Sequence, residues 1–194
     1  NKIEQNAFKG CINLKTISIP DSINVIPARC FENCIELTKV ELPSTITKIS
    51  NNAFCNCYNL IDIIISDIVT EIGSSAFHNC SNLCKIQIPD SVIEIGPSAF
   101  EGCRSLESIN LSQKIKYINC NTFRGCELLN KIWIPKNVAI IGSEAFGGCE
   151  NMSIVAIQSN HIKIDPTAFL QCSNISRLYL ANNNPNVVIS SFGD

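Results

Sequence analysis

The stretch Ala76–Gly96 reads A-F-H-N-C-S-N-L-C-K-I-Q-I-P-D-S-V-I-E-I-G, and its pattern recurs along the whole chain. All nine phenylalanines lie 23 residues apart: Phe8, Phe31, Phe54, Phe77, Phe100, Phe123, Phe146, Phe169 and Phe192. A fixed period of about 20 to 50 residues is the signature of a repeat architecture. We therefore expect one solenoid domain over residues 1–194, with about eight full repeats and an incomplete repeat at each end.

Other anchor positions of the unit recur with the same period. Three residues after each of the first eight phenylalanines stands a cysteine: Cys11, Cys34, Cys57, Cys80, Cys103, Cys126, Cys149 and Cys172. Three residues later stands an aliphatic side chain: Leu14, Leu37, Leu60, Leu83, Leu106, Leu129, Met152 and Ile175. An isoleucine closes most units: Ile26, Ile49, Ile72, Ile95, Ile118, Ile141 and Ile164. One such unit cannot bury its apolar face alone, so neighbouring units must stack.

Each part of the unit predicts a local structure. The L-x-x-I-x-I part alternates as a strand with one buried face does, and a proline, which lacks the amide donor, ends it at Pro20, Pro43, Pro89 and Pro135. The V-x-x-I part predicts a shorter strand on the opposite side, and the A-F-x-x-C-x-x-L part a brief turn of 3₁₀ or α-helix. Small polar residues should bond the backbone of the turns: Ser22, Thr45, Ser91, Asn137, Asn160 and Asn183.

The combined pattern of A-F-x-x-C-x-x-L and I-P-x-S-V-x-x-I-G resembles the BspA-like, Treponema-type leucine-rich repeat family over essentially the whole chain. The resemblance implies a right-handed solenoid with a parallel concave β-sheet. It also implies adhesion or recognition at the surface of bacteria or anaerobic protists. The last repeats depart from the pattern at Met152, Gln158, His161, Ala181 and Asn184.

The composition argues against two classes of partner. The formal net charge is −2 with acidic and basic residues interspersed, so no basic patch predicts a nucleic acid. The apolar run Ile61–Ile65 is far shorter than a membrane span and is interrupted by Asp62. No secretory signal sequence is visible. We therefore predict neither nucleic-acid binding nor membrane insertion of this segment.

The twelve cysteines could form disulfides, a zinc site or part of the core. Eight share one column, where side chains point the same way from parallel backbones and are poorly placed for disulfides; buried there, a thiol packs as a small hydrophobic group. Cys30 also takes a core position, whereas Cys55, Cys84 and Cys120 should be partly exposed. No C-x-x-C spacing supports zinc. We predict reduced thiols, no metal and no cofactor.

The sequence offers no set of residues suited to catalysis. His78 and His161 lie in different repeats, and neither has a Ser, Cys or Asp partner at a motif spacing. No glycine-rich phosphate loop is present. We therefore do not expect an enzyme, and a metal- or thiol-dependent enzyme remains only a third hypothesis, which a zinc measurement would test.

Two columns should point outward from the concave sheet. One is Thr16, Lys39, Asp62, Lys85, Ser108, Lys131, Ile154 and Arg177; the other is Ser18, Glu41, Ile64, Gln87, Asn110, Trp133, Ala156 and Tyr179. Aromatic residues and arginine are enriched at binding hot spots, which makes the candidate site Lys131, Trp133, Ile154, Ala156, Arg177 and Tyr179. Alternatively, these side chains only cover one another or contact a terminal cap.

Two non-catalytic functions therefore stay open. By the family resemblance, the chain is a cell-surface or secreted recognition module that binds a host or matrix protein through its concave sheet. The alternative is an intracellular, cytoplasmic scaffold for protein–protein interaction. Many thiols without a disulfide framework, and no visible signal sequence, favour this second hypothesis. A signal peptide and anchor in the full-length protein, or their absence, would distinguish the two.

Overall fold

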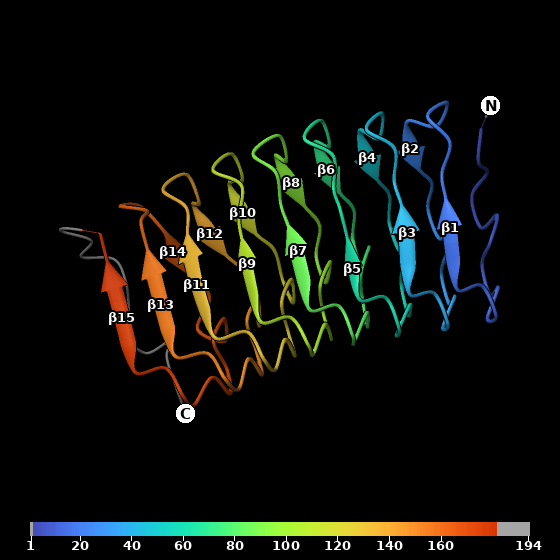
Figure 1. Cartoon of the computed structure of the whole chain (residues 1–194). Helices are drawn as coiled ribbons and strands as arrows, with labels where there is room; N and C mark the ends of the chain where they lie inside the picture. The colour runs from blue at the N-terminus through green and yellow to red at the C-terminus, as the bar shows by residue number, and fades with distance from the viewer. Residues whose placement is uncertain (1, 182–194) are drawn as a thin grey trace.

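The computed structural model describes residues 2–181 as two layers of parallel strands joined by turns (Figure 1). The longer strands form one eight-stranded sheet in the order β1-β3-β5-β7-β9-β11-β13-β15. Their bounds are Thr16–Ser18 (β1), Lys39–Glu41 (β3), Asp62–Ile63 (β5), Lys85–Gln87 (β7), Ser108–Asn110 (β9), Lys131–Ile134 (β11), Ile154–Ile157 (β13) and Arg177–Leu180 (β15). Neighbouring strands pair in parallel at equivalent positions, as Thr16 with Lys39. The predicted solenoid with a parallel sheet is confirmed.

The predicted shorter strands form the opposite layer, in two separate sheets. One contains Val25–Ile26 (β2), Lys48–Ile49 (β4), Glu71–Ile72 (β6) and Glu94–Ile95 (β8). The other contains Tyr117–Ile118 (β10), Ile140–Ile141 (β12) and Lys163–Ile164 (β14).

The break between these two sheets lies between β8 and β10. In the preceding turn, the amide N–H of Gly96 donates to the carbonyl oxygen of Ile72, at 2.8 Å. At the break, the carbonyl oxygen of Ile95 instead accepts the side-chain Nδ2 of Asn119, at 2.7 Å. The side chain of Asn119 thus stands where a backbone amide stands one turn earlier.

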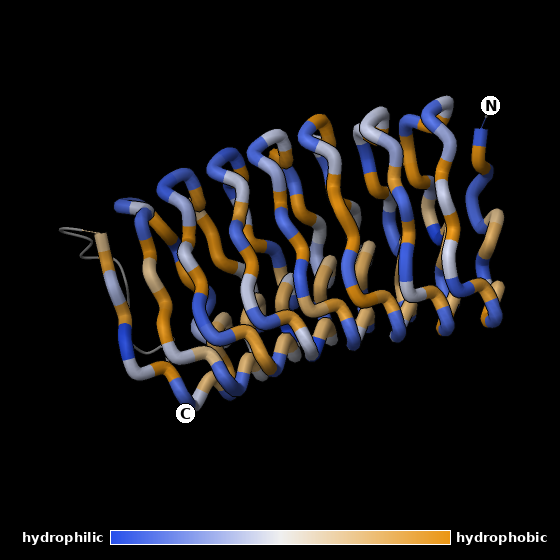
Figure 2. Tube along the Cα trace, in the orientation of Figure 1, coloured by the Kyte–Doolittle hydropathy of each residue, from blue (hydrophilic) through white to orange (hydrophobic). Residues whose placement is uncertain are grey.

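The phenylalanines form one stack through the interior, between the two layers. Phe31, Phe54, Phe77, Phe100, Phe123, Phe146 and Phe169 are fully buried, and neighbouring ring centroids are 5.1 to 5.5 Å apart. This distance is close to the roughly 4.7–4.9 Å between adjacent strands, so one ring stacks on the next in every turn. Figure 2 shows apolar positions recurring at the same level of each turn.

The phenylalanines at the two ends of the series differ from those in the interior. Phe8 is only partly buried, rather than part of one buried column from Phe8 to Phe169, because its ring stacks on Phe31 alone among the described phenylalanines. Phe192 lies outside the described residues.

The expectation of brief helical turns was wrong, because residues 2–181 contain no helix. The amide N–H of Phe31 donates to Ala53 of the next turn at 2.8 Å, and that of Asn33 donates to Cys55 at 2.8 Å. In an α-helix each of these amides would bond a carbonyl four residues back along the same chain. Bonds between stacked turns therefore replace the local helix.

Three of the expected polar residues bond the turns. Thr45 Oγ1 donates to the carbonyl oxygen of Ile23 at 2.6 Å, and Ser91 Oγ donates to that of Val69 at 2.7 Å. Asn137 Nδ2 donates to the carbonyl oxygen of Gln113 at 2.7 Å. Asn183, which was expected to join them, lies outside the described residues.

The cysteine column is buried from Cys34 to Cys172, and it does more than fill space. Each of its thiols donates a hydrogen bond to the carbonyl oxygen of the phenylalanine in the preceding turn, as Cys34 does to Phe8 at 3.1 Å and Cys172 does to Phe146 at 3.0 Å. The interpretation of these thiols as purely hydrophobic was therefore incomplete.

Two expectations about individual cysteines were wrong. Cys11, in the first repeat of the column, is exposed. Cys55 is buried, and burial together with the charge of Glu32 raises its pKa to about 11. Cys84 is partly exposed and Cys120 is exposed, as predicted. All twelve thiols are free.

Candidate binding face on the eight-stranded sheet

Strand alternation places the candidate residues on the outer face of the eight-stranded sheet. In β11, Lys131 and Trp133 are exposed, while Ile132 and Ile134 are buried. The register then aligns Lys131 with Ile154 and Arg177, and Trp133 with Ala156 and Tyr179. The structure thus brings all six predicted residues together on three adjacent strands.

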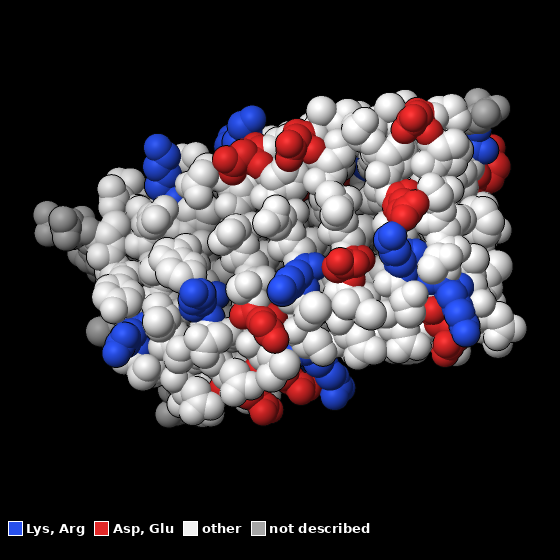
Figure 3. All heavy atoms as spheres, viewed as in Figure 1, with Lys and Arg blue, Asp and Glu red and all other residues white. Residues whose placement is uncertain are grey.

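The second of these rows forms a slot between two aromatic side chains. Trp133 is 43% exposed and Tyr179 is 55% exposed, whereas Ala156 between them is only 9% exposed. Two strand spacings separate the aromatic residues by about 9.5 Å. The resulting hollow has a volume of about 490 Å³ and is lined by Trp133, Ala156, Ile157, Gln158, Tyr179, Leu180 and Ala181. Figure 3 shows this end of the face as a largely uncharged area with basic groups at its margin.

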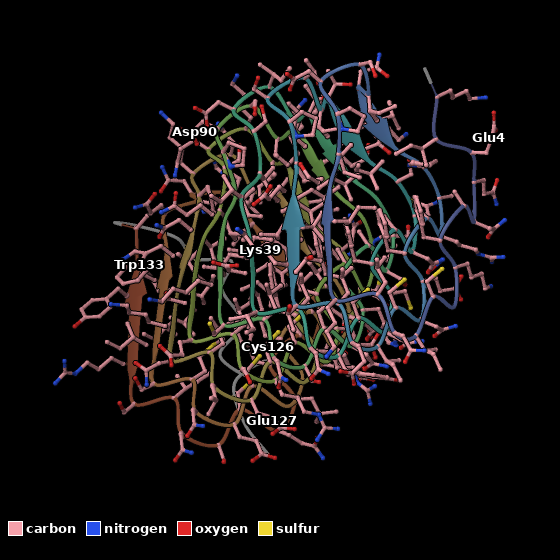
Figure 4. The ribbon with its side chains drawn as sticks, turned by 45° about the vertical axis from the view of Figure 1, so that its right-hand side comes forward. Glu4, Lys39, Asp90, Cys126, Glu127 and Trp133 are labelled. Carbon is pink, nitrogen blue, oxygen red and sulfur yellow. The ribbon has the colours of Figure 1, made fainter. Side chains whose placement is uncertain are left out.

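The side chains of the other row flank this slot without lining it. The Lys131 ammonium lies 5.2 Å from the centre of the Trp133 ring, a cation–π contact that helps to hold the indole. Ile154 is half-buried and Arg177 is exposed. Figure 4 shows Trp133 at the outer edge of the molecule, whereas Cys126 belongs to the interior.

Four lining residues were missed by the sequence interpretation: Ile157, Gln158, Leu180 and Ala181. Gln158 and Ala181 follow strands that end without proline, so the amide of Gln158 donates to Ile134 at 3.0 Å and that of Ala181 donates to Ile157 at 2.8 Å. Strands β13 and β15 have four residues each, as does β11, which Pro135 follows. The departure of these repeats from the I-P pattern was the available signal.

The opposite end of the face is more polar. Lys39 Nζ lies 2.7 Å from Glu41 Oε1, and this hydrogen bond lowers the pKa of Glu41. Ile64 belongs to the aromatic column, which is the outward column that contains Trp133 and Tyr179. It is 84% exposed and lies between Glu41 and Gln87 of that column. The slot between Trp133 and Tyr179 therefore differs from this polar end in combining apolar walls with a hollow.

The thiols and histidines do not form a reactive site in the described part of the chain. Burial raises the pKa of Cys30 to about 12 and that of Cys34 to about 11, which keeps both thiols protonated and poorly nucleophilic. His78 Nδ1 faces Glu101 Oε2 at 3.7 Å and has no nucleophile beside it among its recorded partners. Within residues 2–181, no cluster of three or more His, Cys, Asp or Glu side chains could hold a metal ion.

Comparison with known families agrees with this geometry. The model of the BspA-type leucine-rich repeat region, which comprises six copies of the repeat, matches residues 1–126 and 93–194. The two matches together cover the whole chain. This chain belongs to the BspA-type leucine-rich repeat family. The resemblance stated from the sequence is thereby confirmed.

Solved structures of other leucine-rich proteins share the fold. A leucine-rich repeat protein of T. pallidum is 31% identical with a TM-score of 0.71, over 76% of this chain and 69% of that chain. A leucine-rich cell surface protein of Faecalibacterium prausnitzii is 24% identical with a TM-score of 0.64, over 93% of this chain and 63% of its own. A leucine-rich repeat protein of Bacteroides ovatus is 26% identical with a TM-score of 0.60, over 92% of this chain and 58% of its own.

Two further findings concern curated relatives and membrane-spanning helices. No curated protein matches it significantly. The described residues contain no helix with the length and apolar character of a membrane span.

Proposed function

We propose that this chain is a non-catalytic module that binds a protein ligand through the face formed by β11, β13 and β15. The slot between Trp133 and Tyr179 carries this proposal, since it joins exposed aromatic walls, a small floor residue and basic neighbours. Buried aromatic and arginine anchors dominate the energetics of most protein interfaces. The contact residues are Lys131, Trp133, Ile154, Ala156, Arg177 and Tyr179.

We place the module at the cell surface or in a secreted protein, where it would recognise a host or matrix protein. Membership of the family supports this location, as does the similar fold of a protein described as a leucine-rich cell surface protein. The second candidate is an intracellular scaffold for protein–protein interaction. It is favoured by twelve free thiols, since disulfides are common in oxidising compartments and rare in the cytosol.

The decisive experiment measures which surface a ligand uses. Candidate ligands captured from extracellular matrix and from lysate would be purified, and their affinities measured for the parent chain and two variants. Trp133→Ala should weaken binding by roughly 2 kcal/mol, the usual scale for a hot-spot residue. Lys39→Ala, at the opposite end of the same sheet, should leave the affinity nearly unchanged, and thermal melts would verify that both variants fold.

The outcome separates the hypotheses. Affinity that ignores Trp133 but falls on substitution of residues in the turns or on the shorter strands would move the site away from this face and overturn the proposal. A ligand found only among extracellular proteins supports the surface role, and one found only in lysate supports the scaffold.

A further inference from the structure

A row of basic residues crosses the same sheet, and the aromatic slot does not explain it. Lys85 in β7, Lys131 in β11 and Arg177 in β15 occupy one outward column at every second strand. Their alignment is continuous, since Lys85 pairs with Ser108, Ser108 with Lys131, Lys131 with Ile154, and Ile154 with Arg177. Two strand spacings put successive charges about 9.5 Å apart. We call Lys85, Lys131 and Arg177 the cation row.

The cation row is not neutralised by ion pairs within the described residues. None of its three members forms an ion pair within 4.0 Å among residues 2–181, whereas Lys39, in the same column, is paired with Glu41 at 2.7 Å. Two acidic side chains lie near the row, since Asp62 pairs with Lys85 in the register and Glu107 directly precedes Ser108, which lies between Lys85 and Lys131. The end beside Trp133 and Tyr179 is therefore the more positive, although the chain carries a net charge of −2.

The spacing of the cation row selects among peptide conformations. A polyproline II helix has three residues per turn and rises about 3.1 Å per residue, so residues i, i+3 and i+6 share one side at intervals of about 9.3 Å. In an α-helix, residues i and i+7 are about 10.5 Å apart. From Lys85 to Arg177, over two intervals, the row spans about 19 Å. Two intervals of a polyproline II helix match this length to within about 1 Å. Two seven-residue intervals of an α-helix exceed it by about 2 Å.

The neighbouring aromatic column supports the same conformation independently. Trp133 and Tyr179 face each other across Ala156, and proline-rich segments in the polyproline II conformation dock into grooves lined by aromatic residues. Such a segment keeps little conformational freedom before binding, so ordering it costs less free energy than ordering a flexible chain.

We propose that the sheet binds an acidic, proline-containing peptide segment in the polyproline II conformation that runs across the strands. Carboxylates at every third residue contact Lys85, Lys131 and Arg177, and an intervening proline occupies the slot between Trp133 and Tyr179. Arg177 can hold its carboxylate through two parallel hydrogen bonds, which lysine cannot do. The inference rests on the proposed function, because it assigns a ligand to the same face.

The test compares two labelled synthetic peptides by fluorescence anisotropy with the intact chain. One carries glutamates at i, i+3 and i+6 with prolines between them; the other has the same composition with the three glutamates adjacent. The spaced peptide should bind more tightly, and its affinity should fall as salt screens the contacts. Lys131→Ala and Arg177→Ala should each weaken it by up to about fivefold, the range of an exposed ion pair. Glu107→Gln should strengthen it.

A matched control lies on the other layer. Lys116 is an exposed lysine beside β10, and Lys116→Ala should leave the affinity unchanged. Equal affinity for the two peptides, failure of both to bind, or full affinity in a variant lacking all three members of the cation row would overturn the inference. Preferential binding of heparin through the row would also overturn it, since the ligand would then be an acidic glycan. If the peptides fail but a captured protein still depends on Trp133, the proposed function stands without this inference.

Discussion

The thiol of Cys103 donates a hydrogen bond to the carbonyl oxygen of Phe77, which lies 3.2 Å away in the preceding turn. The same oxygen accepts the amide N–H of Cys80 at 3.1 Å. The cysteine column is therefore a ladder of donors that joins each turn to the one before it. A methyl group at these positions could fill most of the volume, but it could not make this bond.

Replacement of one column thiol should therefore be costly. We expect Cys103→Ala to lower the free energy of unfolding by about 1–3 kcal/mol, through loss of the buried hydrogen bond and of contacts around the sulfur. Denaturant titration would measure the change. Cys120→Ala, at an exposed thiol, should change the free energy by less than about 0.5 kcal/mol. Equal effects of the two substitutions would contradict the ladder.

The phenylalanine stack should show a gradient between its interior and its first ring. Phe100 stacks on Phe77 and Phe123, with centroids 5.4 and 5.5 Å away, so Phe100→Ala should cost about 3–5 kcal/mol. Phe8 has one recorded ring neighbour and is only partly buried, so Phe8→Ala should cost clearly less. Thermal and denaturant melts of both variants test this order, and a larger loss at Phe8 would refute it.

Native alkylation should divide the cysteines into three groups. We expect Cys11 and Cys120 to react rapidly with iodoacetamide, Cys84 more slowly, and the buried thiols slowest of all. Burial both blocks access and disfavours the thiolate, as in Cys55, where it raises the pKa to about 11. Peptide mass spectrometry over time would report each site. Fast labelling of all twelve cysteines in the folded protein would contradict the structure.

Stability should fall in alkaline solution. Burial raises the pKa of Cys30 from 9.0 to about 12, so the folded state holds this proton more tightly than the unfolded state does. The resulting stabilisation is complete below pH 9.0, and it decreases as pH rises towards about 12. Urea titrations at several pH values would measure the slope. Cys30→Ala should make the slope shallower, and an unchanged slope would exclude this thiol as a cause.

Replacement of Gly96, where neighbouring turns approach closely, should lower stability more than replacement of Gly10, where only the backbone conformation is unusual. A Cβ at Gly96 would clash with the backbone nitrogen of Ser74, so Gly96→Ala should cost about 2–3 kcal/mol. Gly10 has a φ of +73° but open space around it, so Gly10→Ala should cost only about 1 kcal/mol, from backbone strain. Melting curves of the two variants would show which effect dominates.

The fold was predictable from the sequence because each column repeats without insertion, so one unit determines the others. The local structure around Phe31 and Cys34 was not predictable, because their spacing fits a helix as well as it fits a turn. Only stacking decides between them, through bonds such as that from Phe31 to Ala53. Likewise, the burial of Cys55 depends on the packing of neighbouring turns, which the sequence of one repeat does not show.

The candidate face was predictable as far as strand alternation reaches. Alternation placed Trp133 and Tyr179 outward, and the fixed period aligned them across Ala156. It did not predict the contribution of Leu180, whose position alternates inward but which is 39% exposed in β15, the last described strand of the sheet. Nor could it show that Lys39 is paired with Glu41 while Lys131 is not.

The break between β8 and β10 gives the rod a preferred point of mechanical failure. A stacked solenoid carries tension through the bonds that join adjacent turns, and on the shorter-strand side the sheet is interrupted there. Force applied at the two ends would therefore first separate the turns at Asn119. The strands β11, β13 and β15 lie together on one side of that point, whereas Lys85 lies in β7 on the other side, so a peptide bound along the whole cation row would bridge the break.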